Sequence, residues 1–204
     1  MKAATSKPAA RPTGKVPPRE VRIIGGLWKR SKLPVTDAPG LRPTPDRVRE
    51  TLFNWLGQDL SGWRCLDAFA GSGALGFEAA SRGASEVTLI ERERRAARLL
   101  TDAKERLKAD TVHVENADAL AWMARSAAGR FELVFIDPPF DSDAIVPALD
   151  AAVRLVVEGG YIYLEAAHAL PPEAATERGL RVHRQSRAGA VHFHLLQRDA
   201  AAGG

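Results

Sequence analysis

Cysteine is almost absent from this sequence of 204 residues, in which Cys65 is the only one. A single cysteine excludes a disulfide framework and a zinc site built from cysteine pairs. Because Cys65 lies on an apolar stretch, we expect it to be a core residue. His192 and His194 share one face of the last predicted strand with no third ligand nearby. That pattern predicts a solvated face and no metal site.

Long apolar runs are missing as well. No run approaches the roughly 18 residues that a membrane span needs, and residues 1–8 contain no apolar stretch typical of a secretory signal. Hydrophobic residues still make up 45 % of the chain, which is enough for a sizeable core. We therefore expect a soluble, cytoplasmic protein with one domain and an extension.

Charge is distributed unevenly along the chain. Residues 1–47 contain 11 basic and 3 acidic residues, a net charge of +8, whereas residues 48–204 contain 18 basic and 22 acidic residues, a net charge of −4. This asymmetry predicts an N-terminal part that faces nucleic acid, with a solubilising tail as the alternative. The candidate nucleic-acid contacts are Arg22, Lys29, Arg30, Arg42, Thr44 and Arg47, of which the five basic residues are the candidate phosphate contacts.

Four segments differ in composition. Residues 1–19 are rich in Ala, Pro and Lys and have no acidic residue, which predicts a disordered basic tail. Residues 20–58 are interpreted as a hairpin and helix extension that contacts RNA, residues 59–198 as the catalytic domain, and residues 199–204 as a flexible C-terminus.

Local signals in the extension predict its elements. Residues 21–24 and 27–30 flank Gly25-Gly26, a pattern typical of a short hairpin or two extended arms. Thr44 is expected to cap a helix whose first residue is Pro45, because threonine and proline favour those positions. The apolar face of that helix begins at Val48, and Gly57 can end it.

From residue 64 onward, strand-like and helix-like segments alternate. The predicted strands span residues 65–69, 86–91, 112–114, 131–137, 161–165, 180–186 and 190–197. The predicted helices span residues 74–82, 92–108, 120–125 and 144–155. Such alternation predicts an α/β protein with a parallel sheet covered on both faces, and the last two strands predict an antiparallel hairpin at the edge of the sheet.

A glycine-rich loop follows the first of these strands. Gly71-Ser72-Gly73-Ala74-Leu75-Gly76 matches G-x-G-x-x-G, and Glu91 follows Gly71 by 20 residues at the end of the next strand. This arrangement meets the dinucleotide-binding fingerprint, in which an acidic residue binds ribose hydroxyls. A nicotinamide-dependent oxidoreductase is therefore one candidate.

Two carboxylates favour a different cofactor. Asp67 precedes Gly71 by four residues, where it would repel a pyrophosphate and attract a cation. S-adenosylmethionine carries a sulfonium and an ammonium group and no phosphate. Asp118, after the third strand, is placed to accept a hydrogen bond from an adenine amino group, although capping of the following helix is the alternative.

The tetrad Asp137-Pro138-Pro139-Phe140 ends the fourth strand. Two prolines stop the strand and fix the backbone. Asp137 and the Pro138 carbonyl can accept hydrogen bonds from an exocyclic amine of a base, and Phe140 can stack on that base. The tetrad therefore predicts methylation of an amine by positioning and electrostatics.

Residues 67–73 and 137–140 resemble motifs I and IV of class I amino-methyltransferases. Residues 22–28, 40–44 and 46–56 resemble the RsmD family, the bacterial 16S ribosomal RNA guanine-N2 methyltransferases. The resemblance implies a Rossmann-like fold with a mostly parallel seven-stranded sheet, an antiparallel C-terminal hairpin strand and a short N-terminal extension. It also implies methyl transfer from S-adenosylmethionine, with S-adenosylhomocysteine as product, to one guanine of the small ribosomal subunit. We expect the protein to be a monomer.

The sequence thus yields two sets of site residues. The expected catalytic residues are Asp137, Pro138, Pro139 and Phe140. The expected cofactor-binding residues are Asp67, Phe69, Gly71, Ser72, Gly73, Glu91, Arg92, Asp118 and Ala119. The alternatives are a DNA adenine or cytosine amino-methyltransferase, an NAD(P)-dependent oxidoreductase, and a non-catalytic RNA-binding protein of the same fold.

Overall fold

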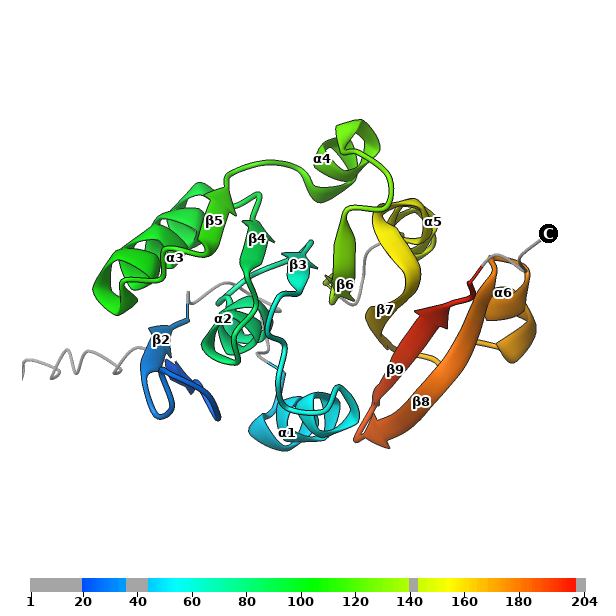
Figure 1. The fold of residues 1–204 in the computed structure, drawn as a ribbon, viewed down its shortest axis with the longest axis horizontal. Coiled ribbons are helices and arrows are strands. Elements are labelled where there is room, and N and C mark those ends of the chain that lie inside the picture. The colour runs from blue at the N-terminus through cyan, green and yellow to red at the C-terminus, as the bar shows by residue number, and fades with distance from the viewer. Residues whose placement is uncertain (1–19, 36–43, 140–142, 201–204) are drawn as a thin grey trace, which may run out of the picture.

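The computed structural model describes residues 20–35, 44–139 and 143–200 (Figure 1). Its strands are β1 (Glu20–Arg22), β2 (Lys32–Pro34), β3 (Arg64–Asp67), β4 (Glu86–Ile90), β5 (Val112–Glu115), β6 (Phe131–Ile136), β7 (Val156–Ala166), β8 (Leu180–Ala188) and β9 (Val191–Arg198). Its helices are α1 (Asp46–Trp55), α2 (Ala74–Ser81), α3 (Arg94–Leu107), α4 (Ala119–Arg125), α5 (Ile145–Leu155) and α6 (Pro172–Thr176). The predicted tail, Arg42 and Phe140 lie outside the described residues.

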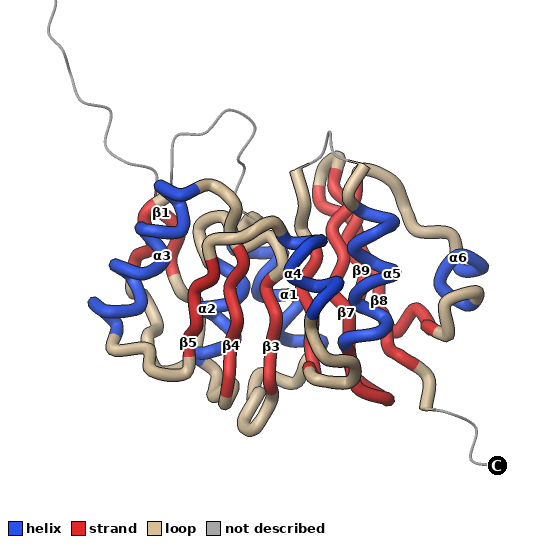
Figure 2. Tube along the Cα trace, turned by 90° about the horizontal axis from the view of Figure 1, so that it is seen from above, coloured by secondary structure: helices blue, strands red, loops and turns tan. Residues whose placement is uncertain are grey.

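Seven strands form one sheet in the order β5-β4-β3-β6-β7-β9-β8. The first five of these run parallel, and β9 is antiparallel to β7, with Glu165 opposite Phe193. β8 pairs antiparallel with β9 at the edge. The predicted α/β fold, with a mostly parallel seven-stranded sheet and a C-terminal hairpin, is confirmed, and Figure 2 shows the strands side by side between the helices.

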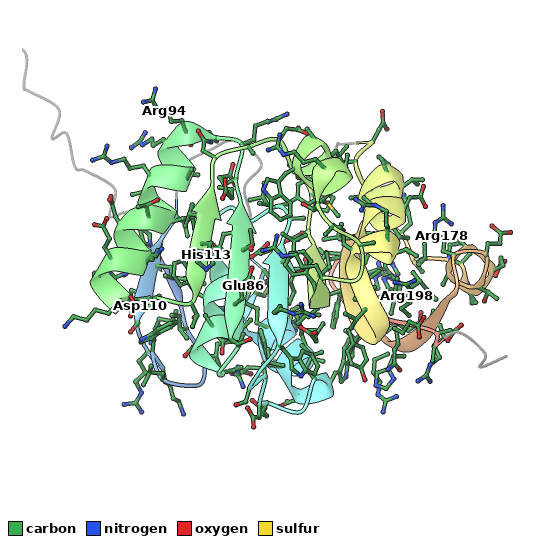
Figure 3. The ribbon with its side chains drawn as sticks, turned by 45° about the horizontal axis from the view of Figure 1, so that its top comes forward. Glu86, Arg94, Asp110, His113, Arg178 and Arg198 are labelled. Atoms are coloured by element: carbon green, nitrogen blue, oxygen red, sulfur yellow. The ribbon has the colours of Figure 1, made fainter. Side chains whose placement is uncertain are left out.

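Two cores lie on opposite faces of the sheet. Helices α1, α2 and α3 pack on one face, and α4, α5 and α6 pack on the other. Successive strand residues point to opposite faces, so Phe135 of β6 lies in the first core and Val134 in the second. Cys65 is buried in the first core, as predicted. Arg178 and Arg198 lie at one end of the molecule (Figure 3). Arg94, the first residue of α3, and Asp110, which follows α3, lie at the other end.

The N-terminal hairpin is confirmed, but its second strand is not where the pattern predicts it. β2 follows residues 27–30 instead of containing them, and Val21 pairs with Leu33. The intervening segment docks on α2, where Leu27 N donates to Ser81 O at 2.7 Å and Trp28 N donates to Ser81 Oγ at 2.9 Å. These hydrogen bonds use the backbone N–H groups of Leu27 and Trp28, so those groups are not free to pair in a β-strand.

Three other details differ from the prediction. β7 begins at Val156, which pairs with Phe131 ahead of a register shift, so the strand is longer than expected. The five-residue helix α6 follows a proline and has no periodic pattern long enough to predict it. His194 is buried, and its Nε2 accepts a hydrogen bond from Leu170 N at 3.1 Å, so the expected solvated face is wrong for this residue. No helix in the described ranges is long and apolar enough to cross a membrane.

Candidate active site

The glycine loop joins β3 to α2 at the carboxyl edge of the sheet. Gly71 has φ of +53° and Gly73 has φ of +76°, a left-handed conformation that favours glycine. A Cβ atom on Gly73 would lie 2.6 Å from Leu100 Cδ2 and 2.7 Å from Phe77 Cδ2. The loop therefore requires glycine both for its backbone conformation and for close packing against α2 and α3.

Glu91 follows β4 and closes this loop from the side. Its Oε2 accepts a hydrogen bond from Gly71 N at 2.9 Å, and its Oε1 accepts one from Glu93 N at 2.7 Å. The Glu91 carbonyl accepts a hydrogen bond from Asn116 Nδ2 at 2.8 Å. The structure thus brings the predicted loop and the predicted ribose-binding acid into direct contact.

Asp67 lies beneath the loop and is 2 % exposed. Its Oδ2 accepts a hydrogen bond from Gly76 N at 3.0 Å. Burial raises the pKa of Asp67 to about 7, with a further contribution from the charge of Glu91, and the Gly76 hydrogen bond opposes this rise. A buried carboxyl with a raised pKa gains from a nearby cation, because the cation favours its ionised form.

The remaining predicted cofactor residues lie along the same edge. Asp118 is exposed and caps α4, accepting a hydrogen bond from Ala121 N at 2.9 Å. Ala119 is buried as the first residue of α4, and Phe69 packs against the second core. Ser72 is partly buried in the loop, and Arg92 is exposed after Glu91. The capping interaction of Asp118 is therefore present, and its predicted contact with adenine stays a prediction.

A second set of polar groups surrounds Asp137, which follows β6. The Thr44 hydroxyl lies 3.2 Å from Asp137 Oδ2 and donates to Glu165 Oε1 at 2.9 Å. The Tyr163 hydroxyl donates to the same Glu165 oxygen at 2.8 Å. Pro138 is buried and Pro139 is exposed. The two prolines thus hold Asp137 at the end of its strand, beside Thr44, which precedes α1, and two polar residues of β7.

The predicted capping role of Thr44 is wrong. α1 begins at Asp46, Pro45 is its N-cap residue, and no side chain caps the helix. Thr44 is 6 % exposed, and its hydroxyl contacts the two carboxyl groups. A hydroxyl that bonds to residues about 90 and 120 positions away leaves no local signal in the sequence.

The pKa values of Asp137 and Glu165 are both raised above their ordinary values. Burial, then the charge of Glu165, then that of Asp67 raise the pKa of Asp137, and the Thr44 hydrogen bond lowers it. Burial raises the pKa of Glu165, while hydrogen bonds from Tyr163 and Thr44 lower it. Three acids therefore face one region from the ends of β3, β6 and β7.

These residues fit a cationic cofactor. Asp67, Glu91 and Asp118 follow or end three neighbouring strands, so the edge is lined by carboxyl groups and would repel a pyrophosphate. The left-handed turn at Gly71 and Gly73 lets the chain approach a ligand closely. Within the described ranges, no group of three or more His, Cys, Asp or Glu residues could hold a metal ion.

The predicted RNA contacts form no single cluster. Arg22, Lys29 and Arg30 are exposed on the docked N-terminal segment. Arg47 is exposed in the first turn of α1, three residues after Thr44, and no ion pair within the described residues includes it. Thr44 belongs to the Asp137 network, and among the predicted basic contacts that the structure describes, Arg47 lies nearest to Thr44 along the chain.

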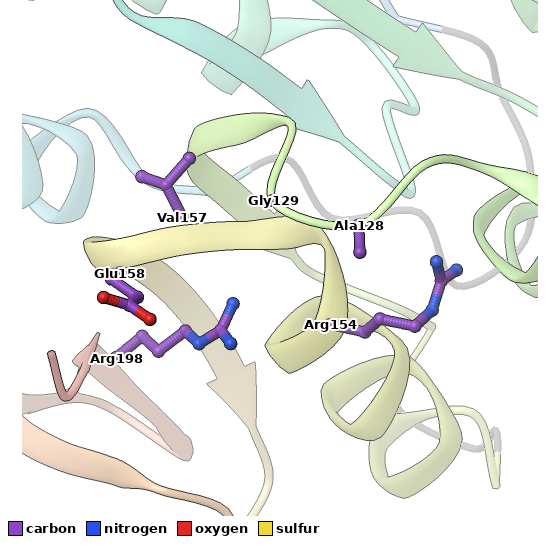
Figure 4. Close-up of a pocket in the computed structure, with 6 residues that line it drawn as sticks. All are labelled: Ala128, Gly129, Arg154, Val157, Glu158 and Arg198. Atoms are coloured by element: carbon purple, nitrogen blue, oxygen red, sulfur yellow. The ribbon is translucent and has the colours of Figure 1, made fainter. Parts of the chain in front are cut away.

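A hollow of about 420 Å³ lies at the opposite edge of the sheet (Figure 4). It is lined by Ala128, Gly129, Arg154, Val157, Glu158 and Arg198. Arg154 Nη1 donates to Ser126 O at 2.6 Å, and Arg198 Nη1 donates to Val156 O at 2.6 Å. Both guanidinium groups thus stabilise connections at the amino ends of β6 and β7, away from the carboxyl edge.

A model of the family described as Conserved hypothetical protein 95 matches residues 21–197. The chain belongs to this family. It is 43 % identical over 188 residues to ribosomal RNA small subunit methyltransferase D of Escherichia coli strain K12, covering 89 % of this chain and 91 % of the relative. It is 38 % identical over 187 residues to the protein of the same name from Haemophilus influenzae, covering 87 % of this chain and 94 % of the relative. The family resemblance seen in the sequence is confirmed.

Solved structures agree with this family assignment. The putative methyltransferase yhhF from Escherichia coli superposes with a TM-score of 0.77 at 37 % identity, covering 89 % of this chain and 99 % of that chain. A precorrin-6y C5,15-methyltransferase from Geobacter metallireducens, at 17 % identity and a TM-score of 0.64, shares the fold. Family and fold together confirm the predicted class I methyltransferase architecture.

Three residues near the carboxyl edge of the sheet, Tyr163, Glu165 and Arg187, were not singled out in the sequence. Glu165 and Tyr163 belong to β7, and their alternation with apolar neighbours is typical of any strand. Arg187 is exposed on the β8–β9 hairpin, opposite His192, which itself pairs with Ala166 at the carboxyl edge. The only available signal for Glu165 is an acid at the end of a buried strand, whereas the two prolines and the aromatic residue that follow Asp137 made a recognisable motif.

Proposed function

We propose that this protein transfers a methyl group from S-adenosylmethionine to the exocyclic N2 amine of one guanine in 16S ribosomal RNA. The observation that carries the proposal is the carboxyl group of Asp137, held at the sheet edge by Thr44 and two prolines beside the glycine loop. The names of the relatives, ribosomal RNA small subunit methyltransferase D, support the substrate. The proposal includes that the protein acts as a monomer, in the cytoplasm, on the small ribosomal subunit.

The cofactor, when bound, supplies an activated methyl group. Glu91 would bind its ribose hydroxyls, Asp67 would face its cationic groups, and Asp118 would accept from the adenine amine. The backbone at Gly71 and Gly73 would lie against the cofactor, with Ser72, Phe69, Arg92 and Ala119 around it. This assignment follows from the acid-lined edge, which matches the positive charge of the cofactor.

Asp137 and the Pro138 carbonyl would hold the target amine. The lone pair of an exocyclic amine is delocalised into the base, so the amine is a poor nucleophile. Two acceptors that bind its two hydrogens fix the nitrogen and orient its lone pair toward the methyl carbon. Phe140, which lies outside the described residues, would stack on the base, and such stacking is worth about 1–3 kcal/mol.

Replacing Glu91 with alanine should weaken S-adenosylmethionine binding by about 1–3 kcal/mol, because charge-assisted hydrogen bonds to the ribose would be lost. Titration calorimetry measures the change directly. Glu115→Ala is the matched control, since Glu115 is exposed on the neighbouring strand β5. NAD should not bind the unmodified protein, and tight NAD binding without a response to S-adenosylmethionine would favour the oxidoreductase instead.

Replacing Arg47 with alanine should lower the affinity for small-subunit RNA and flatten its salt dependence. Each phosphate contact in a single strand contributes about −0.7 to the slope of log affinity against log salt concentration. Filter binding at several salt concentrations gives the slope. Arg181→Ala is the control, because Arg181 is also exposed but lies on β8, where it pairs with Asp199.

An unchanged slope for Arg47→Ala, with the fold intact, would show that the RNA surface lies elsewhere. The exposed Arg187 on the β8–β9 hairpin is the next position to test, because this hairpin reaches the same edge of the sheet as Asp137.

Competition between substrates tests the proposed reaction. The protein is incubated with methyl-labelled S-adenosylmethionine, small ribosomal subunits assembled from unmodified RNA, and double-stranded DNA of matched mass. We expect label in the RNA and not in the DNA. Label in the DNA alone would favour the DNA amino-methyltransferase, and RNA binding without any transfer would favour a non-catalytic protein.

A further inference from the structure

We propose that Asp137 and Glu165 act as one proton-sharing pair bridged by the Thr44 hydroxyl, in which Glu165 is a positioning residue that decides the charge on Asp137. This inference rests on the proposed methylation of an exocyclic amine, and it adds where the proton of that amine goes.

The two carboxyl groups end neighbouring parallel strands. Ile136 pairs with Leu164, so Asp137 and Glu165 are the next residues of β6 and β7 in the same register. Thr44 comes from a distant part of the chain and lies between them, 3.2 Å from Asp137 Oδ2 and 2.9 Å from Glu165 Oε1. Glu165 is 4 % exposed, so bulk water does not screen it well.

The single hydrogen of the Thr44 hydroxyl explains why Asp137 and Glu165 share a proton. A threonine hydroxyl carries one hydrogen, so Thr44 can donate to only one of the two carboxyl groups at a time. The contact with the other carboxyl is a hydrogen bond only if that carboxyl is protonated and donates to the Thr44 oxygen. When Thr44 donates to Glu165, which also accepts from Tyr163, the proton belongs on Asp137. When the hydroxyl turns the other way, Glu165 carries the proton and Asp137 is ionised.

The charges around the pair favour this single proton. Asp67 faces Asp137 from β3, on the opposite side from Glu165, and adds a further negative charge. None of the ion pairs among the described residues includes Asp137 or Glu165. Adjacent carboxyl groups without a cation cannot readily both ionise, and the burial of Glu165 beside the half-buried Asp137 strengthens their repulsion. Two charges are thus less favourable than one charge and one shared proton.

The shared proton fits the chemistry of the amine. As the amine nitrogen bonds the methyl carbon, the carbon–sulfur bond breaks with its electron pair left on sulfur, and the nitrogen must lose one proton. With the shared proton on Glu165, Asp137 is ionised and accepts the amine proton. The pair then carries two protons, and it returns one to water before the next reaction.

Carboxyl carbon NMR of the cofactor-free protein tests the pair without depending on catalysis. The Asp137 signal is followed as pH is changed, and it is assigned by its loss in Asp137→Asn. In Glu165→Gln, we expect Asp137 to titrate at a pH lower by about one unit or more. A shift of that size is the threshold at which two groups count as coupled. In Thr44→Val, we expect it to titrate at a higher pH, because a hydrogen bond to the charged form is lost.

Matched variants separate this effect from general damage. Thr44→Ser keeps the hydroxyl and should leave the Asp137 titration where it is. Thr51→Val makes the same substitution in α1, where the hydroxyl bonds only the Arg47 carbonyl, and should also have no effect. If Thr44→Val fails to fold, Glu165→Gln and Thr44→Ser still decide the outcome.

An Asp137 titration that is the same in Glu165→Gln as in the unmodified protein would overturn the pair. Shifts of the same sign in Glu165→Gln and Thr44→Val would also overturn it. The acid limb of the pH–rate profile for methyl transfer should move in the same direction as the Asp137 signal. Opposite NMR shifts in a protein that transfers no methyl group would support the pair and contradict the proposed function, so the two failures are distinguishable.

Discussion

Replacing Asp137 with alanine should lower the rate of methyl transfer by about 100- to 1000-fold, the loss seen when one positioned electrostatic group is removed from an active site. The affinity for S-adenosylmethionine should change little, because the hydrogen bonds of Asp137 go to Thr44 and, in the proposed reaction, to the target amine. Single-turnover transfer and titration calorimetry on the same preparation separate the two effects.

Asp110→Ala is a suitable control for this variant, because Asp110 is exposed after α3 at the far side of the molecule (Figure 3). It should change neither rate nor affinity. If Asp137→Ala instead abolished cofactor binding and kept its rate per bound cofactor, Asp137 would be a cofactor residue, and the assignment of the target amine to it would be wrong.

Replacing Glu78 with alanine should reduce the free energy of unfolding by about 3–5 kcal/mol, the cost of breaking a buried ion pair from one side. Glu78 has no exposed surface, and it accepts hydrogen bonds from Ile24 N at 2.7 Å and Gly25 N at 2.8 Å. It also pairs with Arg82 at 2.7 Å and with Arg49 at 3.5 Å, and both side chains are buried. One carboxylate of α2 thus holds the N-terminal segment and α1 together.

Urea denaturation measures this loss, with Asp150→Ala as the control. Asp150 pairs with Arg178 at 2.6 Å, but its side chain is 54 % exposed. Exposed pairs contribute about 0–1 kcal/mol, so the control should differ little from the unmodified protein. A loss below about 1 kcal/mol for Glu78→Ala would show that apolar packing, and not this carboxylate, fixes the N-terminal segment.

Local patterns predicted most of the fold. The strand and helix periods between residues 64 and 198 follow side-chain spacing, so most of the predicted segments from β3 to β9 correspond to observed elements. The exceptions depend on distant residues. The segment after Gly26 docks on Ser81, and β7 extends back to Val156 because that residue finds a partner in Phe131.

The candidate site likewise combines residues that local motifs predict with residues that only the tertiary structure brings together. The glycine loop, Glu91 and Asp137 belong to short motifs whose spacing carries their chemistry, so the sequence identifies them. Thr44 and Glu165 are 121 positions apart and meet because α1, which follows Thr44, packs on the sheet through Phe53 and Phe135. Arg49 and Glu78 are separated by 29 positions and are completely buried, although each reads in the sequence as an ordinary charged residue of a helix. Contacts of this kind require the tertiary structure.

The most direct test of the proposed function is the identity of the methylated nucleoside. Small ribosomal subunits assembled from unmodified RNA are incubated with the protein and S-adenosylmethionine, and the RNA is then digested and separated by chromatography with mass detection. We predict N2-methylguanosine from a single position, and about 100- to 1000-fold slower formation of it with Asp137→Ala. Methyl groups on adenine or cytosine, methylated guanosine with the group on another atom, or no methylated nucleoside would contradict the proposal.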